Sequence, residues 1–558
     1  MARLDEHRGK QLLQAAGIAL PRGDRAETPE QAARIAAELD GPCVVKALAL
    51  VTGRAARGWV RMADTPDEAQ AIAAELLAAP EVNAVRVEEK LAIRREFFAA
   101  ALVDDRAGQP LVVLSSRGGS GIEQIAAEYP DSVARRHVDV RRGLEPYMGR
   151  QLAASVGLTG KLQVRCGTLL TQLYDAFTRF DCRSLEINPV VETEDGKLVA
   201  ADCHAAIDDY AVFRQPSLGI RMAREIGHDP GERELIAWEV EKNDYRGTFF
   251  FIQLADATSG DNYVAFHGAG GGGSMMSMDA LMKEGFQPAN FCDTSGNPPA
   301  SKVYRAAKVL LSMPGIVGYF ASGSGVASQE QWQSAIGLIK AFRELGLTVP
   351  AVIRLGGNQE ERAIELLQRH CAALDAPVEA YGKDDSARFC AQRLRQLVDG
   401  YQPPAKPSAP DPISADKLPP DAYHFRTMTG EIAIDQSRWT EETARAVADA
   451  CPRGILKVVD AAEGRGEAML RPDDATSQNQ GRSMASPLRV VLAISEEDAA
   501  KGRCIECLAC ELKACELGVK AIRIDLPMPT QDAVAQAPVL APGTSRGARA
   551  TGSQEGGK

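Results

Sequence analysis

Glu186, Asn188 and Asp202 have the types and spacing that suit metal chemistry. They lie in LEINPVVETEDGKLVAAD, where two apolar runs of strand composition are joined through Asp195-Gly196, a strong hairpin signal. Folding about that turn brings Asn188 and Asp202 to within about one residue of directly opposite, and Glu186 shares the face of Asn188. These oxygens suit Mg²⁺ held partly by nucleotide phosphates. A solvated hairpin face is the alternative.

Glycine-rich turns form a second chemical pattern between residues 245 and 400. Each turn follows an apolar strand and precedes an amphipathic helix, at residues 267–273, 322–325 and 356–358. Such units predict a doubly wound sheet with ligand sites at the carboxyl ends of its strands. Ser324, Gly325 and Val326 precede a helix expected from about residue 328 to 345, and a helix start attracts anions. Tight turns without a ligand are the alternative.

These residues require several domains to position them, because 558 residues exceed what one core organises. Helical periods alternate with short apolar runs, for example a helix at 28–39 followed by a strand at 43–47, which predicts an α/β fold. A proline-rich stretch at 402–420 predicts an extended linker. The Pro, Ala, Gly and Ser-rich tail after about residue 527 predicts disorder.

The composition is that of a globular protein, with 45% hydrophobic and 25% charged residues. A net charge of −11 argues against nucleic acid or an anionic membrane surface as the main partner. The charged N-terminus is unlike a signal peptide, and no stretch reaches the roughly 20 apolar residues of a membrane span. We therefore expect a cytoplasmic protein. Free thiols in a reducing compartment would explain seven cysteines scattered singly through apolar segments: Cys43, Cys166, Cys182, Cys203, Cys292, Cys371 and Cys390.

Several segments, in order and at nearly the same spacing, resemble the succinyl-CoA synthetase beta subunit over residues 1 to about 398. They are LDEHRGKQLL, VVKALALVTGRAARGWV, VEEKLAIRREFF, SSRGGSGIE, PYMGRQLA, LEINPVV and VFRQP. The resemblance implies an ATP-grasp nucleotide-binding domain at 1–235, clamping ATP or GTP between two α/β lobes, and a flavodoxin-like CoA-ligase domain at 245–400. It also implies residue roles: Lys46 at the nucleotide phosphates, Glu88 and Glu96 at the base and ribose pocket, and Asn188 with Asp202 at Mg²⁺.

The glycine loop after Lys46 departs from the GGRGKAGG-like run of that family. Gly53 and Arg54 are retained as nucleotide-binding residues, Arg54 also as a catalytic one, but Ala55 replaces a glycine and Ala56 replaces the lysine. Phosphate is cradled by backbone N–H groups that small residues leave accessible, so Ala55 is compatible with binding. The adjacent Arg57 could supply the lost charge. We expect nucleotide turnover, with weak binding by a degenerate loop as the alternative.

The resemblance implies that the second domain makes an acyl phosphate, which the thiol of CoA attacks after phosphate exchange with a histidine. Ser324, Gly325 and Val326 would face that phosphohistidine. None of the seven histidines has its context, so we expect it, with most of the CoA site, on a separate alpha subunit. His267 stands where the family usually has a substrate-binding asparagine; a packing or capping role is its alternative. Residues 294–299 (TSGNPP) also differ at the expected substrate pocket, so the acid need not be succinate.

A cysteine module follows at residues 422–527, after a linker at 401–421 and before a disordered tail at 528–558. Cys504, Cys507 and Cys510 form a C-x2-C-x2-C run, and Cys451 precedes a proline. In bacterial ferredoxins such a set ligates one [4Fe-4S] cluster, and the module resembles a small α+β two-cluster ferredoxin that has lost one cluster. At the positions where further cysteines of the lost cluster would lie, the chain has Glu441, Ala444 and Val447. Cys515 is assigned to that vacated site. Zinc is the competing metal, and the cytoplasmic setting disfavours disulfides.

These patterns predict the beta subunit of an ADP- or GDP-forming acyl-CoA synthetase. Its partners would be an alpha subunit, a carboxylic acid or acyl-CoA, and a redox enzyme such as a 2-oxoacid:ferredoxin oxidoreductase. Its cofactors would be Mg²⁺, ATP or GTP, and one [4Fe-4S] cluster. The alternative is an electron-transfer protein in which the synthetase portion is a non-catalytic scaffold, an interpretation that the altered glycine loop supports.

Overall fold

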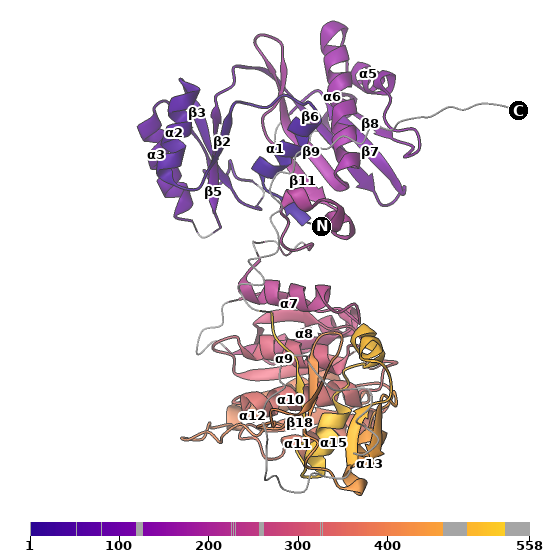
Figure 1. Ribbon diagram of the computed structural model, residues 1–558. Coiled ribbons are helices and arrows are strands. Elements are labelled where there is room, and N and C mark those ends of the chain that lie inside the picture. Colours follow the sequence, from indigo (N-terminus) through magenta and orange to yellow (C-terminus); the bar gives the residue numbers. More distant parts are fainter. Residues whose placement is uncertain are drawn as a thin grey trace, which may run out of the picture. The chain divides into compact units, whose positions relative to one another are not determined.

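The computed structural model describes residues 2–51, 53–79, 81–118, 127–224, 226, 228, 230–255, 262–323, 325, 327–460 and 488–529 (Figure 1). The chain forms two compact units that meet in sequence between Pro230 and Gly231. No helix among these residues is long and apolar enough to cross a membrane. Most of the tail predicted to be disordered, from residue 530 on, lies outside the described residues.

The first unit contains a small four-stranded antiparallel sheet in the order β2-β5-β3-β4. Helices α2 (Pro29–Leu39) and α3 (Pro66–Leu77) pack together against it (Figure 1). The side chains of Thr28 and Thr65 cap these helices, each with a proline in the first turn. The helix predicted at 28–39 and the strand predicted at 43–47 are both confirmed. The strands are β2 (Gly23–Ala26), β3 (Cys43–Leu48), β4 (Val60–Ala63) and β5 (Ala84–Glu89).

The other part of this unit is an antiparallel sheet in the order β1-β11-β9-β6-β7-β8, with β10 also pairing with β9. Its apolar face packs on α6 (Gly160–Arg179), which α5 (Pro146–Ser155) crosses. A Cβ on Gly149 would lie 2.5 Å from the Gly167 carbonyl, so this close helix crossing needs glycine. The strands are β1 (Ala2–Leu4), β6 (Ile93–Asp104), β7 (Gln109–Ser115), β8 (Val133–His137), β9 (Cys182–Thr193), β10 (Leu198–Ala200) and β11 (His204–Ile207), and α1 spans Glu6–Ala15.

The second unit is built on a sheet in the order β12-β15-β13-β16-β17-β18, with a short β14 (Gln287–Pro288) beside β13. Only β12 runs antiparallel to its neighbour among these described strands; the others are parallel. The predicted doubly wound sheet is therefore confirmed, and the three glycine-rich turns lie at the carboxyl ends of β13, β16 and β17. The strands are β12 (Phe250–Gln253), β13 (Tyr263–Ala269), β15 (Asn290–Asp293), β16 (Gly318–Gly323), β17 (Ala351–Arg354) and β18 (Val378–Tyr381).

Two helix layers cover this sheet because successive residues of its strands face opposite sides. Phe320 packs with residues of α8 and α12, whereas its neighbours Tyr319 and Ala321 pack with residues of α9, α10 and α11. The helices are α8 (Gly271–Lys283), α9 (Ala300–Leu311), α10 (Trp332–Leu345), α11 (Glu360–Cys371) and α12 (Ala387–Gly400), and α7 spans Glu232–Lys242.

Helix α10 begins at Trp332, so the expected start near residue 328 is wrong. The residues before it are held in another conformation by side chains and backbone of neighbouring loops. The Gln329 N–H donates to Asn297 Oδ1 at 2.8 Å, and the Gln331 N–H donates to the Asn358 carbonyl at 2.8 Å. A helical path would give up these bonds, and the glycine turn therefore does not open directly into the helix.

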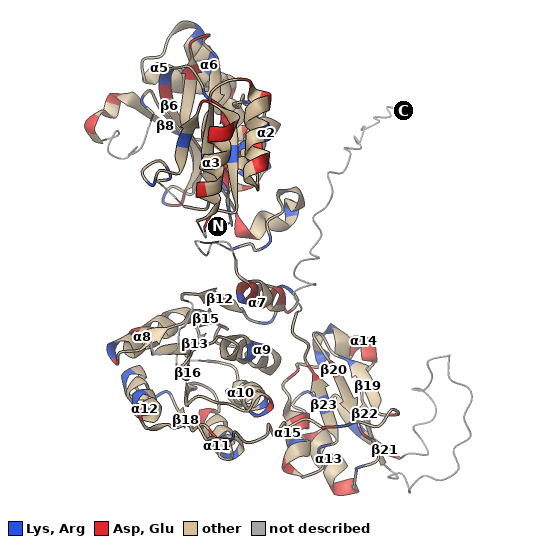
Figure 2. Ribbon diagram, turned by 90° about the vertical axis from the view of Figure 1, so that its left-hand side faces the viewer, with Lys and Arg blue, Asp and Glu red and all other residues tan. Residues whose placement is uncertain are grey.

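The cysteine module packs on α10 within the same unit (Figure 2). Its apolar residues join the core formed by α9, α10 and α11. It contains the sheet β19-β20-β23, the antiparallel pair β21-β22 and the helices α13, α14 and α15. The bounds are β19 (Tyr423–Arg426), β20 (Glu431–Ile434), α13 (Glu441–Asp449), β21 (Leu456–Asp460), β22 (Leu488–Leu492), α14 (Glu496–Asp498), α15 (Ala509–Glu516) and β23 (Ile522–Asp525).

The proline-rich segment 402–420 contains no helix or strand, but it is not a free tether. Ile413, Ser414 and Ala415 are buried. The Ala415 N–H donates to the Ile522 carbonyl at 3.0 Å, and Asp375 accepts from the Ser408 N–H at 2.6 Å. The segment is therefore a packed part of the second unit.

Candidate functional site

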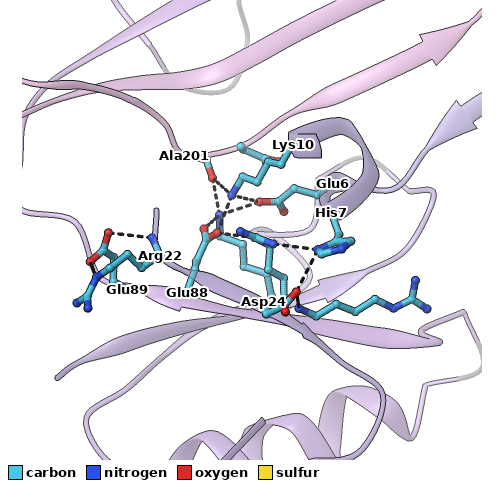
Figure 3. Close-up of polar contacts among 12 residues, drawn as sticks. Glu6, His7, Lys10, Arg22, Asp24, Glu88, Glu89 and Ala201 are labelled. Carbon is cyan, nitrogen blue, oxygen red and sulfur yellow. Dashed lines mark hydrogen bonds and ion pairs between the residues drawn. The ribbon is translucent and has the colours of Figure 1, made fainter. Parts of the chain in front are cut away.

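A buried ionic cluster lies in the first unit, at the junction of α1, β3, β5 and the segment before β11 (Figure 3). It brings together four cations and three carboxylates from distant parts of the sequence. The members are Glu6, Lys10, Lys46, Arg54, Arg86, Glu88 and Asp202. Six of them are buried, and Asp202 has a side chain that is 23% exposed. Buried charges persist only when paired, so the six depend on their partners in the cluster.

Lys46, predicted to contact nucleotide phosphates, is held within this cluster. Its Nζ lies 2.5 Å from Glu88 Oε1 and 3.1 Å from Glu6 Oε1, and it donates to the Ala201 carbonyl at 2.7 Å. Burial by itself would lower the pKa of Lys46, but the carboxylates of Glu6 and Glu88 outweigh that effect and raise it. The ammonium group is thus permanently charged, as a phosphate ligand requires.

Glu6, Lys10 and Arg86 belong to the cluster although their sequence context does not single them out as site residues. Lys10 Nζ lies 2.7 Å from Glu6 Oε1 and 2.6 Å from Glu88 Oε2, and Arg86 Nε donates to Glu88 Oε2 at 2.8 Å. The local signal is the Glu6 and Lys10 pair at helical i,i+4 spacing in the N-terminal segment. Such a pair is normally exposed, and only the tertiary fold shows that this one is buried.

Arg54 and Asp202 also meet in the cluster. Arg54 Nη2 donates to both carboxylate oxygens of Asp202, at 2.8 and 2.9 Å, and lies 2.7 Å from Glu6 Oε2. Burial raises the pKa of Asp202, and the Glu6 carboxylate adds to that rise, against the opposing effect of Arg54 and Lys46. Asp202 therefore has a guanidinium partner at the position where a metal ion was predicted.

The predicted hairpin is confirmed, because Ala200 pairs with Val190 and the Ala201 N–H donates to the Pro189 carbonyl at 3.1 Å. Continuing this register by one residue places Asp202 opposite Asn188. The Asn188 amide donates to Glu186 Oε1 at 3.3 Å. The three oxygen-bearing residues predicted to meet at the hairpin are thus neighbours, beside the phosphate-site candidates Lys46 and Arg54.

Glu88 and Glu96, predicted to mark the base and ribose pocket, lie in different settings. Glu88 is 2% exposed, and its carboxylate pairs with Lys10, Lys46 and Arg86. Glu96 is exposed on β6 and outside the ionic cluster. The structure therefore makes Glu88 a support for Lys46 and leaves Glu96 accessible.

The loop after Lys46 is exposed at Gly53 and Arg57, whereas Arg54 is buried. Gly53 has φ +72°, a conformation that favours glycine, although a Cβ there would meet only open space. The guanidinium of Arg57, the candidate replacement for the lost lysine, lies 5.4 Å from the centre of the Trp59 ring. Arg57 is thus stacked on Trp59 and does not take part in the cluster.

His267 in the second unit is buried in β13. Its Nδ1 lies 2.6 Å from the Tyr319 hydroxyl and its Nε2 lies 3.1 Å from Thr294 Oγ1. Burial lowers the pKa of His267 to about 4, so the ring is neutral near neutral pH. Both ring nitrogens have interior partners, which favours the packing alternative over contact with a carboxylate substrate.

Of the three residues predicted to face the phosphohistidine, Ser324 and Val326 lie outside the described residues. Gly325 has φ +80°, and a Cβ there would lie 3.7 Å from Arg354 Nη2. Arg354 donates to the Gly323 carbonyl at 2.8 Å. This guanidinium, at the end of β17, brings a positive charge to the glycine turn after β16, and no sequence motif marks it.

Cys451, Cys504, Cys507 and Cys510 line one pocket in the second unit, together with apolar residues that include Ile432, Ile455 and Leu508. Burial raises the pKa of both thiols to about 12, so a bound cation is required to hold them as thiolates.

Cys515 does not line this pocket, and its sulfur lies 3.9 Å from Arg343 Nη1. In the part of the chain that the structure describes, no group of three or more His, Cys, Asp or Glu side chains is arranged around a single metal-ion position. The seven cysteines predicted to be buried free thiols are buried and form no disulfide.

Comparison with known proteins matches residues 3–192 to the ATP-grasp domain family. The chain is 36% identical over 369 residues to the beta subunit of the GDP-forming succinate–CoA ligase of Thermus thermophilus, covering 65% of this chain and 93% of that protein. It is 33% identical to the ADP-forming beta subunit of Methanothermobacter thermautotrophicus, covering 65% and 92%. ATP citrate lyase from Methanothrix soehngenii shares the fold, with a TM-score of 0.57 at 18% identity, over 71% of this chain and 99% of that one.

The ATP-grasp assignment agrees with the two-lobed first unit, and the relatives cover the parallel sheet of the second. Identity above 30% over more than nine-tenths of two curated relatives exceeds what a shared fold alone would give. The chain therefore belongs to the family of succinate–CoA ligase beta subunits.

Proposed function

We propose that this chain is the nucleotide-binding subunit of an NDP-forming acyl-CoA synthetase and carries one [4Fe-4S] electron-transfer module. The synthetase function is supported above all by one observation: Lys46, Arg54 and Asp202 lie in one ionic cluster, in a chain that belongs to this family. Two cations for phosphate and a carboxylate for Mg²⁺ are the groups that phosphoryl transfer requires.

The ion pairs in the cluster preorganise these cations. A polyphosphate would compete with Glu6 and Glu88 for Lys46, and with Asp202 for Arg54. Release of Asp202 from Arg54 would then free its carboxylate for Mg²⁺, beside the amide oxygen of Asn188. Nucleotide and Mg²⁺ would therefore bind cooperatively. The phosphates take Arg54 away from Asp202, and Mg²⁺ takes Asp202 away from Arg54.

The acyl-transfer steps would use an alpha subunit that supplies the phosphohistidine and most of the CoA site. The described part of this chain is consistent with that division, since His267 is buried with both ring nitrogens engaged. The substrate would be a carboxylic acid or its CoA thioester, with ATP or GTP as the nucleotide.

The cysteine module would be a ferredoxin-like domain of residues 422–527 with Cys451, Cys504, Cys507 and Cys510 as ligands. The fit is supported by the pocket that all four of these side chains line and by the apolar residues that surround them there. A bound cluster would supply one-electron transfer. A redox enzyme that produces an acyl-CoA together with low-potential electrons, such as a 2-oxoacid:ferredoxin oxidoreductase, would use both modules.

The contact between Arg54 and Asp202 also favours a second candidate, in which the synthetase portion is a scaffold for electron transfer. In that case the ion pairs would be permanent and would block the nucleotide site. Titration of the purified full chain with Mg-ATP and Mg-GTP separates the two. Saturable binding of either nucleotide that requires Mg²⁺ supports the synthetase, and the absence of binding at millimolar nucleotide supports the scaffold.

A further inference from the structure

Two acidic residues of the cysteine run are directed into the ligase domain. Glu506 lies between Cys504 and Cys507, and Glu511 directly follows Cys510. Their exposed fractions are 1% and 0%. A buried carboxylate is stable only with donors around it, so the identity of those donors decides what fixes the loop.

Glu506 takes its donors from two directions. On the ligase side, Arg246 Nη2 donates to Glu506 Oε2 at 2.6 Å and Ser301 Oγ donates to the same oxygen at 2.8 Å. Within the module, Thr427 Oγ1 and the Thr429 N–H donate to Oε1, each at 2.7 Å. The carboxylate thus joins the start of α9 to the cysteine loop.

Glu511, on α15, makes a similar set of contacts with Lys340 of α10. Lys340 Nζ lies 3.0 Å from both carboxylate oxygens, and Lys340 is itself 1% exposed. Ser414 Oγ donates to Glu511 Oε1 at 2.7 Å and the Ile524 N–H donates to it at 2.8 Å. Figure 2 shows α15, which carries Glu511, beside α10, which carries Lys340.

We infer that Glu506 and Glu511 are positioning residues that make the ligase domain a part of the iron-sulfur site. This inference rests on the proposed cluster. The peptide that presents three of the four thiols reaches its geometry only while Arg246, Ser301 and Lys340 hold its two carboxylates. The ligase domain therefore supplies the support that orients the ligands of the metal, and its loss loosens the ligands.

The same contacts reach the expected substrate loops. Ser301 follows the loop 294–299 by two residues, and Asn297 of that loop donates to Ser328 Oγ at 3.0 Å in the segment before α10. Cluster binding and the conformation of these loops are thus linked through the contacts of Ser301 and Asn297. Linkage is reciprocal, so cluster binding also stabilises α9 and α10.

The test uses the full chain, purified without oxygen, as wild type and as Glu506→Gln, Glu511→Gln and Arg246→Gln. Glu497→Gln is the matched control, since Glu497 lies in the same module with its side chain 75% exposed. We expect chelator to remove iron about tenfold faster or more from the Glu506 and Glu511 variants than from wild type. The control should release iron at the wild-type rate.

The reduction potential separates a specific role from general loosening. Glu506→Gln removes a negative charge beside the cysteines and should raise the potential. Arg246→Gln removes the compensating positive charge and should lower it. Shifts of opposite sign support the inference, and shifts of equal sign or no shift contradict it.

A measurement on wild type alone guards against variants that fail to fold. Removal of iron should increase amide hydrogen exchange in α9 and α10, and unchanged exchange there would overturn the inference. Wild type that contains iron and sulfide, with variants that match it in release rate and potential, also overturns the inference while the proposed function stands. Wild type without iron and sulfide instead removes the proposed cluster itself.

Discussion

Arg54 Nη2 lies within hydrogen-bonding distance of both carboxylate oxygens of Asp202, a residue 148 positions later in the chain. The contact joins the glycine loop to the hairpin of β9 and β10. It places a predicted phosphate ligand against a predicted metal ligand, so neither group can be assigned a role without the other. This pair sets the first expectation for nucleotide binding.

Replacement Asp202→Ala should weaken Mg-dependent nucleotide binding by at least about tenfold, because it removes the anionic metal ligand. The fold should persist, since Arg54 keeps Glu6 at 2.7 Å and the Ala47 carbonyl at 3.0 Å. Calorimetric titration with Mg-ATP and Mg-GTP measures the change. Asp195→Ala in the exposed hairpin turn is the control, and wild-type binding by the Asp202 variant would show the metal assignment to be wrong.

Replacement Lys10→Met should destabilise the first unit by about 3–5 kcal/mol, because it leaves Glu6 and Glu88 with one fewer buried cation. Denaturant unfolding followed by circular dichroism gives the change in the free energy of unfolding. Lys197→Met removes an exposed lysine that pairs with Asp195, and it should leave the free energy of unfolding nearly unchanged. Equal effects of the two replacements would contradict the structural role of Lys10.

The purified chain alone should show no acyl-CoA synthetase turnover, because the phosphohistidine and most of the CoA site are expected on an alpha subunit. Adding that subunit should restore activity. The assay follows nucleoside triphosphate formed from acyl-CoA, phosphate and nucleoside diphosphate. Robust turnover by the single polypeptide would refute the two-subunit interpretation.

Chain prepared without oxygen should contain close to four iron and four sulfide, as one [4Fe-4S] cluster requires. Cys451→Ser should sharply lower that content or give a three-iron form. Cys515→Ser should leave it nearly unchanged, because Cys515 does not line the pocket and lies beside Arg343. Zinc without acid-labile sulfide would replace the cluster with a structural metal, and iron loss in the Cys515 variant alone would show that the fourth ligand was misassigned.

Stability of the second unit should fall as the pH drops from about 6.5 towards 4, because burial lowers the pKa of His267 to about 4. In this window the unfolded chain binds a proton that the folded chain excludes, so unfolding becomes more favourable at lower pH. The full effect is on the order of 3 kcal/mol. His267→Asn removes the titrating group, and its thermal unfolding midpoint should depend less steeply on pH. The same pH dependence in both proteins would exclude His267 as the cause.

Local patterns predicted much of this architecture from the sequence. The hairpin at Asp195-Gly196 and the parallel sheet with its glycine turns follow from residue periodicity and turn chemistry, which act over a few residues. The start of α10 was misplaced because Asn297 and Asn358 hold the preceding residues from other loops. Contacts such as Arg246 with Glu506, 260 residues apart, carry no local signal.

The site shows the same division. Lys46, Arg54, Asn188 and Asp202 could be singled out as candidates by motif, but the pairing of Arg54 with Asp202 could not be predicted. Glu6 and Lys10 look like an ordinary pair on an exposed helix face until β3 and β5 cover them. Charge pairing in a protein interior depends on which elements pack together, and that information is spread over the whole chain.

The burial of α9 and α10 on nearly all sides has a practical consequence for making chimeras. Ser301, Lys302 and Arg305 on α9, like Lys340 on α10, face the cysteine module or the loops beside it and have almost no solvent exposure. A chain that ended at residue 400 would expose Lys302, Arg305 and Lys340, and the apolar residues around them, to water. Conversely, grafting the cysteine module onto a shorter relative would require redesign of two helices of the recipient. The cysteine module and the domain that carries α9 and α10 therefore cannot be exchanged independently.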